Sequence, residues 1–142
     1  MQLKFLAKSE NETFARNAVA AFALSLNPSL SQLSDVKTAV SEAVTNCIVH
    51  GYAGAEGWIR IHCKTDGNFL HIEISDSGKG IENLEEALTP FFTTLPDEER
   101  SGMGFTIMQT FMTAFSVQSA PGVGTTVKMS KDFGAEAAAD AV

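Results

Sequence analysis

The stretch Ser41-Glu42-Ala43-Val44-Thr45-Asn46-Cys47-Ile48-Val49-His50 lies in the longest helical pattern of the sequence. Glu42 and Asn46 are one helical turn apart, and Asp35 continues the same line two turns earlier. The apolar stripe of this helix lies elsewhere, on Val36, Val40, Ala43, Val44 and Cys47. The acid and the amide are either an ordinary solvated pair or a face that serves a ligand. The rest of the sequence decides between these readings.

Composition places the chain among globular proteins of one domain. It has 142 residues, of which 44% are hydrophobic and 19% are charged. A net charge of −7 argues against nucleic-acid binding as the main function, because phosphate contacts need clustered cations. Cys47 and Cys63 lie in apolar patterns without metal-site spacing, so we expect buried free thiols. No signal peptide or membrane-length apolar run is visible, and a cytoplasmic location is expected.

Hydrophobic periodicity predicts nine elements in the order β-α-α-β-β-α-α-β-β. Their approximate ranges are strand 3–7, helix 10–26, helix 30–50, strands 58–65 and 69–76, helices 84–88 and 105–113, and strands 115–120 and 125–130. Strand pairs rather than alternating βα units favour an α+β two-layer α/β sandwich, with a mixed, mostly antiparallel sheet and helices on one face. We expect a single domain over residues 1–133 and a frayed acidic, Ala-rich tail over 134–142.

Several local features accompany these elements. Ser9 and Glu12 have the spacing of a capping box, and Gly51 is placed to end the central helix. Asp66-Gly67-Asn68 predicts a three-residue hairpin loop. In the first helix the predicted apolar face comprises Phe14, Ala18, Ala21, Phe22 and Leu26. His62 and His71 fall on the polar face of their strands, where we expect solvated side chains rather than metal ligands.

Three groups of residues together suggest a nucleotide site. Asp76 ends a buried strand and is followed by Gly78 and Gly80, so a flat ligand could approach the turn and an exocyclic amine could donate to the carboxylate. Gly102 and Gly104 open a helix, whose N-terminus favours phosphate. The amide oxygen of Asn46 suits Mg²⁺, and Glu42 could accept the proton of an attacking hydroxyl. Either glycine pair alone is a weak signal; the ordered set is much more specific.

This ordered set resembles the N, G1 and G2 boxes of the gyrase/Hsp90/histidine-kinase/MutL ATPase superfamily. The motifs Ser41–Asn46, Pro90-Phe91-Phe92-Thr93-Thr94 and Glu99–Met108 are further similar to the anti-sigma F factor family of spore-forming bacteria, over roughly residues 3–131. The resemblance implies a Bergerat ATP-binding fold and a dimeric serine kinase. Such a kinase inhibits a sporulation RNA polymerase sigma factor and phosphorylates, and so inactivates, its anti-anti-sigma antagonist of the STAS-domain type.

The resemblance also implies roles for individual residues. Glu42 would be the catalytic base, Asn46 would hold Mg²⁺, and Asp76 would read adenine with Thr126 nearby. The expected ATP/ADP contacts are completed by Gly78, Gly80, Thr93, Thr94, Arg100, Ser101, Gly102, Met103 and Gly104. Glu12 and Arg16, by spacing alone an i,i+4 ion pair, match the family's docking surface for both partners. Leu95 departs from the family, because a basic residue is expected there.

Other functions stay open at this stage. A general-stress-type anti-sigma kinase would carry the same boxes. The catalytic module of a sensor histidine kinase is a further reading, although no phosphoacceptor helix or membrane segment accompanies the boxes here. A binding module that uses ATP only to order its lid is also consistent, since nucleotide binding does not prove phosphoryl transfer.

Overall fold

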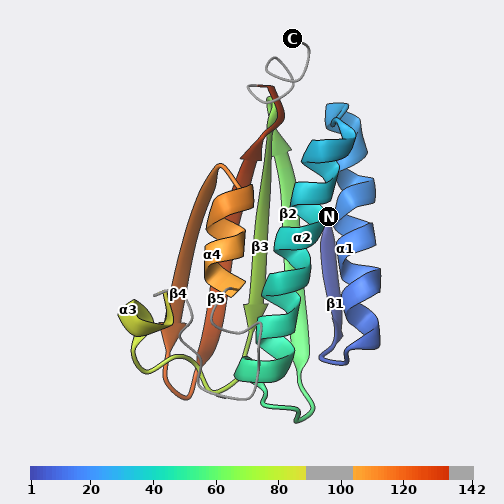
Figure 1. Ribbon diagram of the computed structural model, residues 1–142. Coiled ribbons are helices and arrows are strands. Elements are labelled where there is room, and N and C mark those ends of the chain that lie inside the picture. Colours follow the sequence, from blue (N-terminus) through green and yellow to red (C-terminus); the bar gives the residue numbers. More distant parts are fainter. Residues whose placement is uncertain (89–103, 135–142) are drawn as a thin grey trace.

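The computed structural model describes residues 1–88 and 104–134 (Figure 1). Its strands are β1 (Gln2–Leu6), β2 (Trp58–Asp66), β3 (Phe69–Asp76), β4 (Ala114–Ala120) and β5 (Gly124–Asp132). Its helices are α1 (Glu10–Ala23), α2 (Leu30–Asn46), α3 (Leu84–Ala87) and α4 (Gly104–Phe111), with a 3₁₀ turn at Leu24–Leu26 and a π-helical turn at Cys47–Gly51. The predicted element order is therefore confirmed for the described residues.

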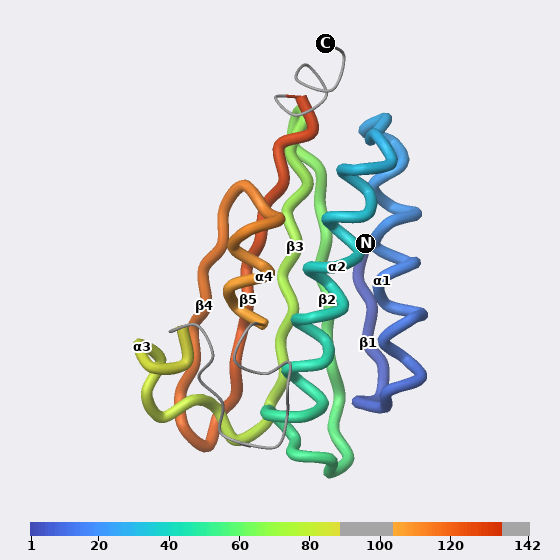
Figure 2. The backbone as a smooth tube through the Cα atoms, in the orientation of Figure 1, coloured from blue at the N-terminus to red at the C-terminus, as the bar shows by residue number. Residues whose placement is uncertain are grey.

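The five strands form one sheet in the order β1-β2-β3-β5-β4. All four strand pairs are antiparallel, so the described sheet is antiparallel throughout and not mixed as the sequence suggested. Helices α1, α2 and α4 cover one face of this sheet, with α2 in the middle (Figures 1 and 2). The predicted α+β sandwich is confirmed.

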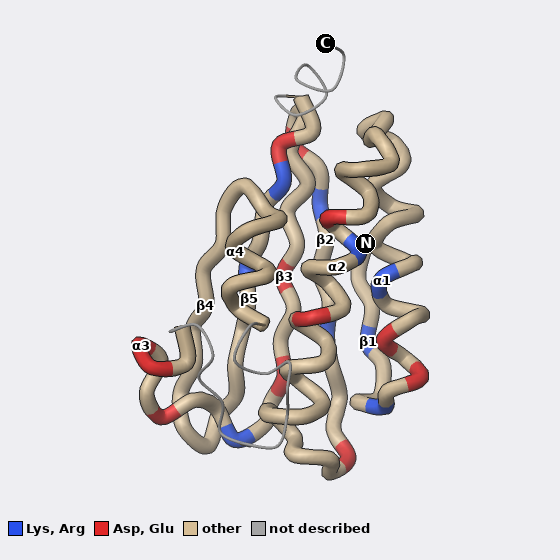
Figure 3. The backbone as a smooth tube through the Cα atoms, viewed as in Figure 1, with Lys and Arg blue, Asp and Glu red and all other residues tan. Residues whose placement is uncertain are grey.

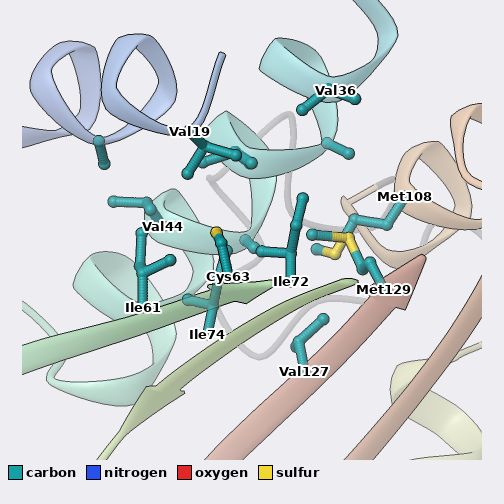
Figure 4. Close-up of a cluster of buried hydrophobic side chains, with 14 of the residues drawn as sticks. Val19, Val36, Val44, Ile61, Cys63, Ile72, Ile74, Met108, Val127 and Met129 are labelled. Atoms are coloured by element: carbon teal, nitrogen blue, oxygen red, sulfur yellow. The ribbon is translucent and has the colours of Figure 1, made fainter. Parts of the chain in front are cut away.

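The core lies between the helices and the covered face of the sheet. The predicted stripe of α2 is buried, and Val36, Val40 and Val44 are each 0% exposed. Opposite it, Ile61, Cys63, Ile72, Ile74, Val127 and Met129 project from β2, β3 and β5 (Figure 4). These alternate along their strands with exposed or half-exposed residues, as the period of two predicts.

Helix α2 begins with a capping box at Ser29, whereas the box predicted at Ser9 does not form. The Ser29 hydroxyl accepts from the Gln32 backbone N–H at 3.0 Å, and the Gln32 side chain accepts from the Ser29 N–H at 2.8 Å. Ser9, by contrast, makes no side-chain cap to α1. Ser9 has helical dihedral angles (φ −55°, ψ −35°) rather than the extended ones of Ser29, and the Glu12 carboxylate is bound by Arg16 and Ser41.

The buried face of α1 differs from the predicted one. Its buried residues are the small Ala15, Val19, Ala20 and Ala23. Small side chains let α1 pack closely on α2. The buried face of α1 is therefore the stripe Ala15, Val19 and Ala23, at positions i, i+4 and i+8, and not the predicted face with its larger side chains. Phe14 is 52% exposed and meets Phe5 edge-on, with 6.1 Å between the ring centroids.

The hairpin between β2 and β3 is tighter than the sequence suggested. Asp66 pairs with Phe69, so the loop has two residues, Gly67 and Asn68, rather than three. Gly67 has φ +60° and no positive φ is recorded for Asn68, which is the pattern of a type II′ turn. His62 is exposed, and His71 is half-buried against Ser130 at 2.8 Å; neither belongs to a metal site in the described chain.

A buried lysine joins the helical layer to the sheet. Lys131 of β5 is 1% exposed, and its ammonium donates to the Phe111 carbonyl at 2.6 Å and to Asp35 Oδ2 at 3.1 Å. Asp35, which lies on the same line of the helix as Glu42 and Asn46, is therefore paired with Lys131. This pair is nearer the N-terminal end of α2 than Glu42 and Asn46 are. Burial of a charge is costly unless it is paired, so this ion pair fixes α2 and α4 relative to β5.

Asp35→Asn is expected to lower the free energy of unfolding by about 2–3 kcal/mol, because it removes a negative charge that faces the buried ammonium of Lys131. The loss is smaller than for a wholly buried pair, since the Asp35 side chain is 25% exposed. Urea unfolding measures it, with Asp66→Asn at the exposed end of β2 as the control. Equal stability of the two variants would contradict a structural role for the pair.

Candidate functional site

The α-helical part of α2 ends at Asn46 and continues into the π-helical turn Cys47–Gly51, so the helical run ends at Gly51, as the sequence predicted. The close approach of Asp76 also favours a glycine there, because a Cβ on Gly51 would lie 2.9 Å from Asp76 Oδ2. The last turn of the central helix therefore packs directly against the end of β3. Single π turns of this kind are frequent at functional sites.

The turn after β3 has the form predicted for a ligand-binding loop. Asp76 is 6% exposed, and its Oδ1 accepts from the Gly78 N–H at 2.9 Å. A Cβ on Gly78 would lie 2.1 Å from the Gly51 carbonyl oxygen, and Gly80 has φ +75°. Both glycines are thus required by close backbone approach or by a left-handed conformation.

Asn46 and the start of α4 meet on the other side of this region. A Cβ on Gly104 would lie 2.9 Å from Asn46 Nδ2, so the glycine lets the N-terminal end of α4 approach the amide. The half-buried Asn46 amide and a helix N-terminus thus lie next to each other. Such an arrangement suits an anion together with a hard cation.

These elements enclose a pocket of about 400 Å³, a volume in the usual range for small-molecule sites. Its lining is mostly apolar, with a few polar groups at its ends. The lining residues are Ala43, Asn46, Cys47, His50, Gly51, Ile74, Asp76, Lys79, Gly80, Ile81, Glu82, Asn83, Glu86, Ala87, Phe105, Thr125 and Val127. Glu86 and Ala87 of α3 belong to this lining, and acidic residues mark this helix in Figure 3. The pocket therefore joins the N-box amide to the Asp76 turn, as the ordered motifs predicted.

Cys47 belongs to the same pocket and is 5% exposed. Burial raises the pKa of its thiol well above the usual value, and the charge of Asp76 and a hydrogen bond to it raise the pKa further. The thiol therefore stays protonated near neutral pH and donates to the Asp76 carboxylate. The pKa of Cys63 is likewise raised, to about 11, chiefly by burial. Both cysteines are free and buried, as predicted.

Thr126 does not line the pocket, and Thr125 takes that place. On β5, Thr125 and Val127 share the face that the helices cover, whereas Thr126 lies between Ser75 and Gln118 on the opposite face. In a strand, a shift of one residue moves a side chain to the other face of the sheet. Thr125 is therefore the threonine of β5 that lies at the pocket, while Thr126 as a nucleotide contact stays a prediction.

Glu42 lies apart from this pocket, although Asn46 one turn away lines it. Glu42 is 4% exposed. It contributes to a second, polar pocket of about 370 Å³, with Glu12, Arg16, Ser34, Lys37, Thr38 and Ser41. The predicted acid and amide face is thus divided between two cavities in the described chain.

The Glu12–Arg16 pair is more than a surface ion pair. Glu12 Oε1 accepts from Arg16 Nη1 at 2.8 Å and also from the Ser41 hydroxyl at 2.5 Å. Ser41 is the direct neighbour of Glu42 in α2. The predicted docking pair is therefore tied to the helix that carries the predicted base, and both line the same pocket.

Several predicted site residues lie outside the described residues: Thr93, Thr94, Leu95, Arg100, Ser101, Gly102 and Met103. The tail beyond Gly134 does so as well, so the division into domain 1–133 and tail 134–142 stays a prediction. Residues 1–88 and 104–134 contain no group of three or more His, Cys, Asp or Glu side chains that could hold a metal ion by itself. The same part of the chain has no helix long and apolar enough to span a membrane.

Among the residues that sequence reasoning did not assign to the site are Cys47, Gly51 and Thr125, which line the pocket, and Tyr52, which lies next to it. Cys47 was assigned only to the core and Gly51 only to a helix end. Tyr52 bridges two backbone segments through its hydroxyl, which accepts from the Ser77 N–H at 2.8 Å and donates to the Trp58 carbonyl at 2.5 Å. The sequence signal that could have pointed to Gly51 and Tyr52 is their position directly after the helix that carries Asn46.

Comparison with known proteins agrees with this geometry. The family described as "Histidine kinase-like ATPase domain" matches residues 5–131. The anti-sigma F factor of a Thermoanaerobacter species is 56% identical over 136 residues, which are 96% of this chain and 95% of that protein. The anti-sigma F factor of Clostridium acetobutylicum is 54% identical over 133 residues, covering 94% and 93% of the two chains.

Solved structures show the same fold. The mycobacterial sensor histidine kinase MprB superposes with a TM-score of 0.55 at 23% identity, covering 70% of each chain. The catalytic domain of the histidine kinase ThkA gives a TM-score of 0.56 at 19% identity, covering 71% of this chain and 68% of that one. With its full-length likeness to the curated relatives, the chain belongs to the anti-sigma F factor family of histidine kinase-like ATPase domains.

Proposed function

We propose that this chain is an anti-sigma factor and an ATP-dependent protein-serine kinase in one domain. It binds and inhibits a sporulation-type RNA polymerase sigma factor, and it phosphorylates a seryl residue of the anti-anti-sigma protein that opposes it. The observation that carries the proposal is the pair of cavities on α2. Asn46 lines a nucleotide-sized pocket with Asp76, while Glu42 lines a polar pocket with Glu12 and Arg16.

In this proposal adenine occupies the first pocket. The Asp76 carboxylate accepts from the exocyclic amine, and Thr125 lies on the same side of the sheet. Apolar groups such as Ile74, Ile81 and Val127 line the pocket where a flat ring would lie. A buried carboxylate already held by the Gly78 N–H needs no reorganisation to accept this donor.

The phosphate groups are proposed to extend toward Asn46 and the N-terminal end of α4. The fit of Mg²⁺ to this place rests on its donor set: an amide oxygen is a ligand that Mg²⁺ accepts, and the ion takes its other oxygens from phosphates and water. ATP with Mg²⁺ supplies the γ-phosphoryl group and neutralises charge that develops on it. Arg100, Thr93, Thr94 and the Ser101–Met103 segment are proposed contacts to the phosphates.

The second pocket is proposed to receive the acceptor serine. The seryl oxygen bonds to the γ-phosphorus as the bond from that phosphorus to the ADP oxygen breaks, and the hydroxyl proton passes to the Glu42 carboxylate. Glu12 and Arg16 hold the incoming protein at the same pocket. Docking and proton transfer are thus assigned to one place on α2.

Arg16→Glu is expected to reduce sigma-factor affinity by at least about 10-fold, because a like charge faces whatever acid the arginine meets on the partner. ATP affinity should stay unchanged, since Arg16 does not line the first pocket. Surface plasmon resonance with the sigma factor and titration with ATP measure the two quantities. Lys64→Glu, on the open face of the sheet, is the control of equal charge change. Unchanged sigma affinity for Arg16→Glu would rule out the docking assignment.

The anti-sigma half of the proposal is tested by transcription in vitro. The chain with Mg·ATP should inhibit RNA polymerase that depends on the sporulation sigma factor, and unphosphorylated anti-anti-sigma protein should restore transcription. Inhibition of polymerase with a general-stress sigma factor instead would assign the chain to that branch of the family. No inhibition of either enzyme would overturn the anti-sigma assignment. A homodimer and a cytoplasmic location stay predictions.

A further inference from the structure

The turn that carries Asp76 is held by a dipeptide outside it. Three successive backbone N–H groups of the turn each have a separate acceptor. Ser77 N donates to the Tyr52 hydroxyl at 2.8 Å, Gly78 N to Asp76 Oδ1 at 2.9 Å, and Lys79 N to the Gly51 carbonyl at 2.8 Å. Two of these three acceptors come from Gly51-Tyr52, directly after the π turn of the central helix.

Tyr52 is itself fixed at several points. Its hydroxyl donates to the Trp58 carbonyl at 2.5 Å, and its backbone N–H donates to the Cys47 carbonyl at 2.9 Å. The ring packs so closely on Gly57 that a Cβ there would lie 2.3 Å from the Tyr52 ring. The phenol therefore reaches the turn from a ring that cannot shift freely.

The π turn Cys47–Gly51 places Tyr52 next to the turn after β3. Asn46, Cys47 and Gly51 all line the nucleotide pocket, and the chain passes from them directly to Tyr52. The end of α2 and the turn after β3 are thus joined by Lys79 N to the Gly51 carbonyl and by Ser77 N to the phenol. A displacement of Ser77 moves its neighbour Asp76, whose carboxylate faces the pocket.

We propose that Tyr52 is a positioning residue of the nucleotide site: its hydroxyl bridges Ser77 N and the Trp58 carbonyl and thereby sets the Asp76 carboxylate for the base of a purine nucleotide. The inference rests on the proposed function, because it takes the pocket to be the ATP site. Tyr52 does not line the pocket, so it acts through Asp76 and not by touching the ligand.

Tyr52→Phe tests this, since it keeps the ring and removes only the hydroxyl. The Kd for ATP should rise roughly 5- to 20-fold, the size expected from the loss of one or two hydrogen bonds. The KM for ATP should rise similarly while kcat in phosphoryl transfer is retained, because no group at the reacting atoms changes. The chain should stay folded, and the midpoint of urea unfolding should fall only by a small amount, because the two lost hydrogen bonds lie at exposed positions.

Trp58→Phe is the matched control. It changes the exposed side chain of the same strand start but keeps the carbonyl that Tyr52 meets. This variant should bind ATP like the unaltered chain. A second readout needs no nucleotide: amide hydrogen exchange at Ser77 should become faster in Tyr52→Phe and stay unchanged in Trp58→Phe.

Wild-type ATP affinity together with unchanged exchange at Ser77 in Tyr52→Phe would overturn the positioning role. A loss of affinity matched by an equal loss in Trp58→Phe would also overturn it, since the effect would then belong to the strand start as a whole. Failure of the unaltered chain to bind ATP would instead overturn the proposed function. The exchange measurement would still decide whether Tyr52 holds the turn.

Discussion

Asp76→Asn is expected to weaken ATP binding by about 10²-fold. The carboxylate is 6% exposed and accepts from the Gly78 N–H, so its charge acts in a dry, fixed position. A hydrogen bond to a charged group contributes about 1.5–3 kcal/mol, and asparagine would also present N–H groups toward the donor amine of adenine. Isothermal titration with ATP in the presence of Mg²⁺ measures the loss.

Glu73→Gln provides the comparison for Asp76→Asn. Glu73 lies on the same strand but on the open face, opposite His62 and Lys128. Glu73→Gln makes the same change from carboxylate to amide at a position away from the pocket. This variant should retain the ATP affinity of the unaltered chain. If Asp76→Asn binds ATP as tightly as Glu73→Gln does, adenine is not read by Asp76 and the orientation proposed for the nucleotide is wrong.

Glu42→Gln is expected to slow phosphoryl transfer to the anti-anti-sigma protein by roughly 10²–10⁴-fold, the usual range for the loss of a general base. The isosteric amide is chosen because Glu42 is 4% exposed and a smaller residue would leave a cavity. ATP affinity should be unchanged, since Glu42 does not line the nucleotide pocket. Single-turnover transfer at saturating ATP measures the rate.

Two comparisons sharpen the result for Glu42. Glu10→Gln, in the exposed first turn of α1, should transfer phosphate at the normal rate. Asn46→Ala should instead weaken Mg·ATP binding and so impair transfer and sigma binding together. Transfer by Glu42→Gln at the rate of the unaltered chain would exclude proton abstraction by this residue.

Patterns within one element predicted most of the fold. The stripe of α2 from Val36 to Cys47 and the alternation of Ile59, Ile61 and Cys63 each follow from helix or strand periodicity alone, and all of these residues are buried. The Asp76-x-Gly78-x-Gly80 turn was predictable for the same reason, because its conformational needs are local. The expectation that this turn and Asn46 share one site rested instead on the order of the motifs and on their resemblance to a family.

What failed depended on neighbours distant in sequence. Glu42 is 4% exposed and shares a pocket with Glu12 and Arg16 of α1, and a Cβ on Gly51 would lie 2.9 Å from Asp76 Oδ2. The acceptors of Ser77 N and Lys79 N lie 25 or more residues earlier in the chain. Thr125 rather than Thr126 lines the pocket, and two adjacent threonines in a strand give no local signal for which of them faces it.

The most direct test of the account is transfer of labelled γ-phosphate from ATP to an anti-anti-sigma protein by the purified chain. We predict phosphoserine on the partner, dependent on Mg²⁺ and abolished by Asp76→Asn at ATP concentrations that saturate only the unaltered chain. Tight ATP and sigma-factor binding without any phosphoserine would contradict the kinase assignment. The chain would then be a binding module that uses ATP without transferring its phosphate.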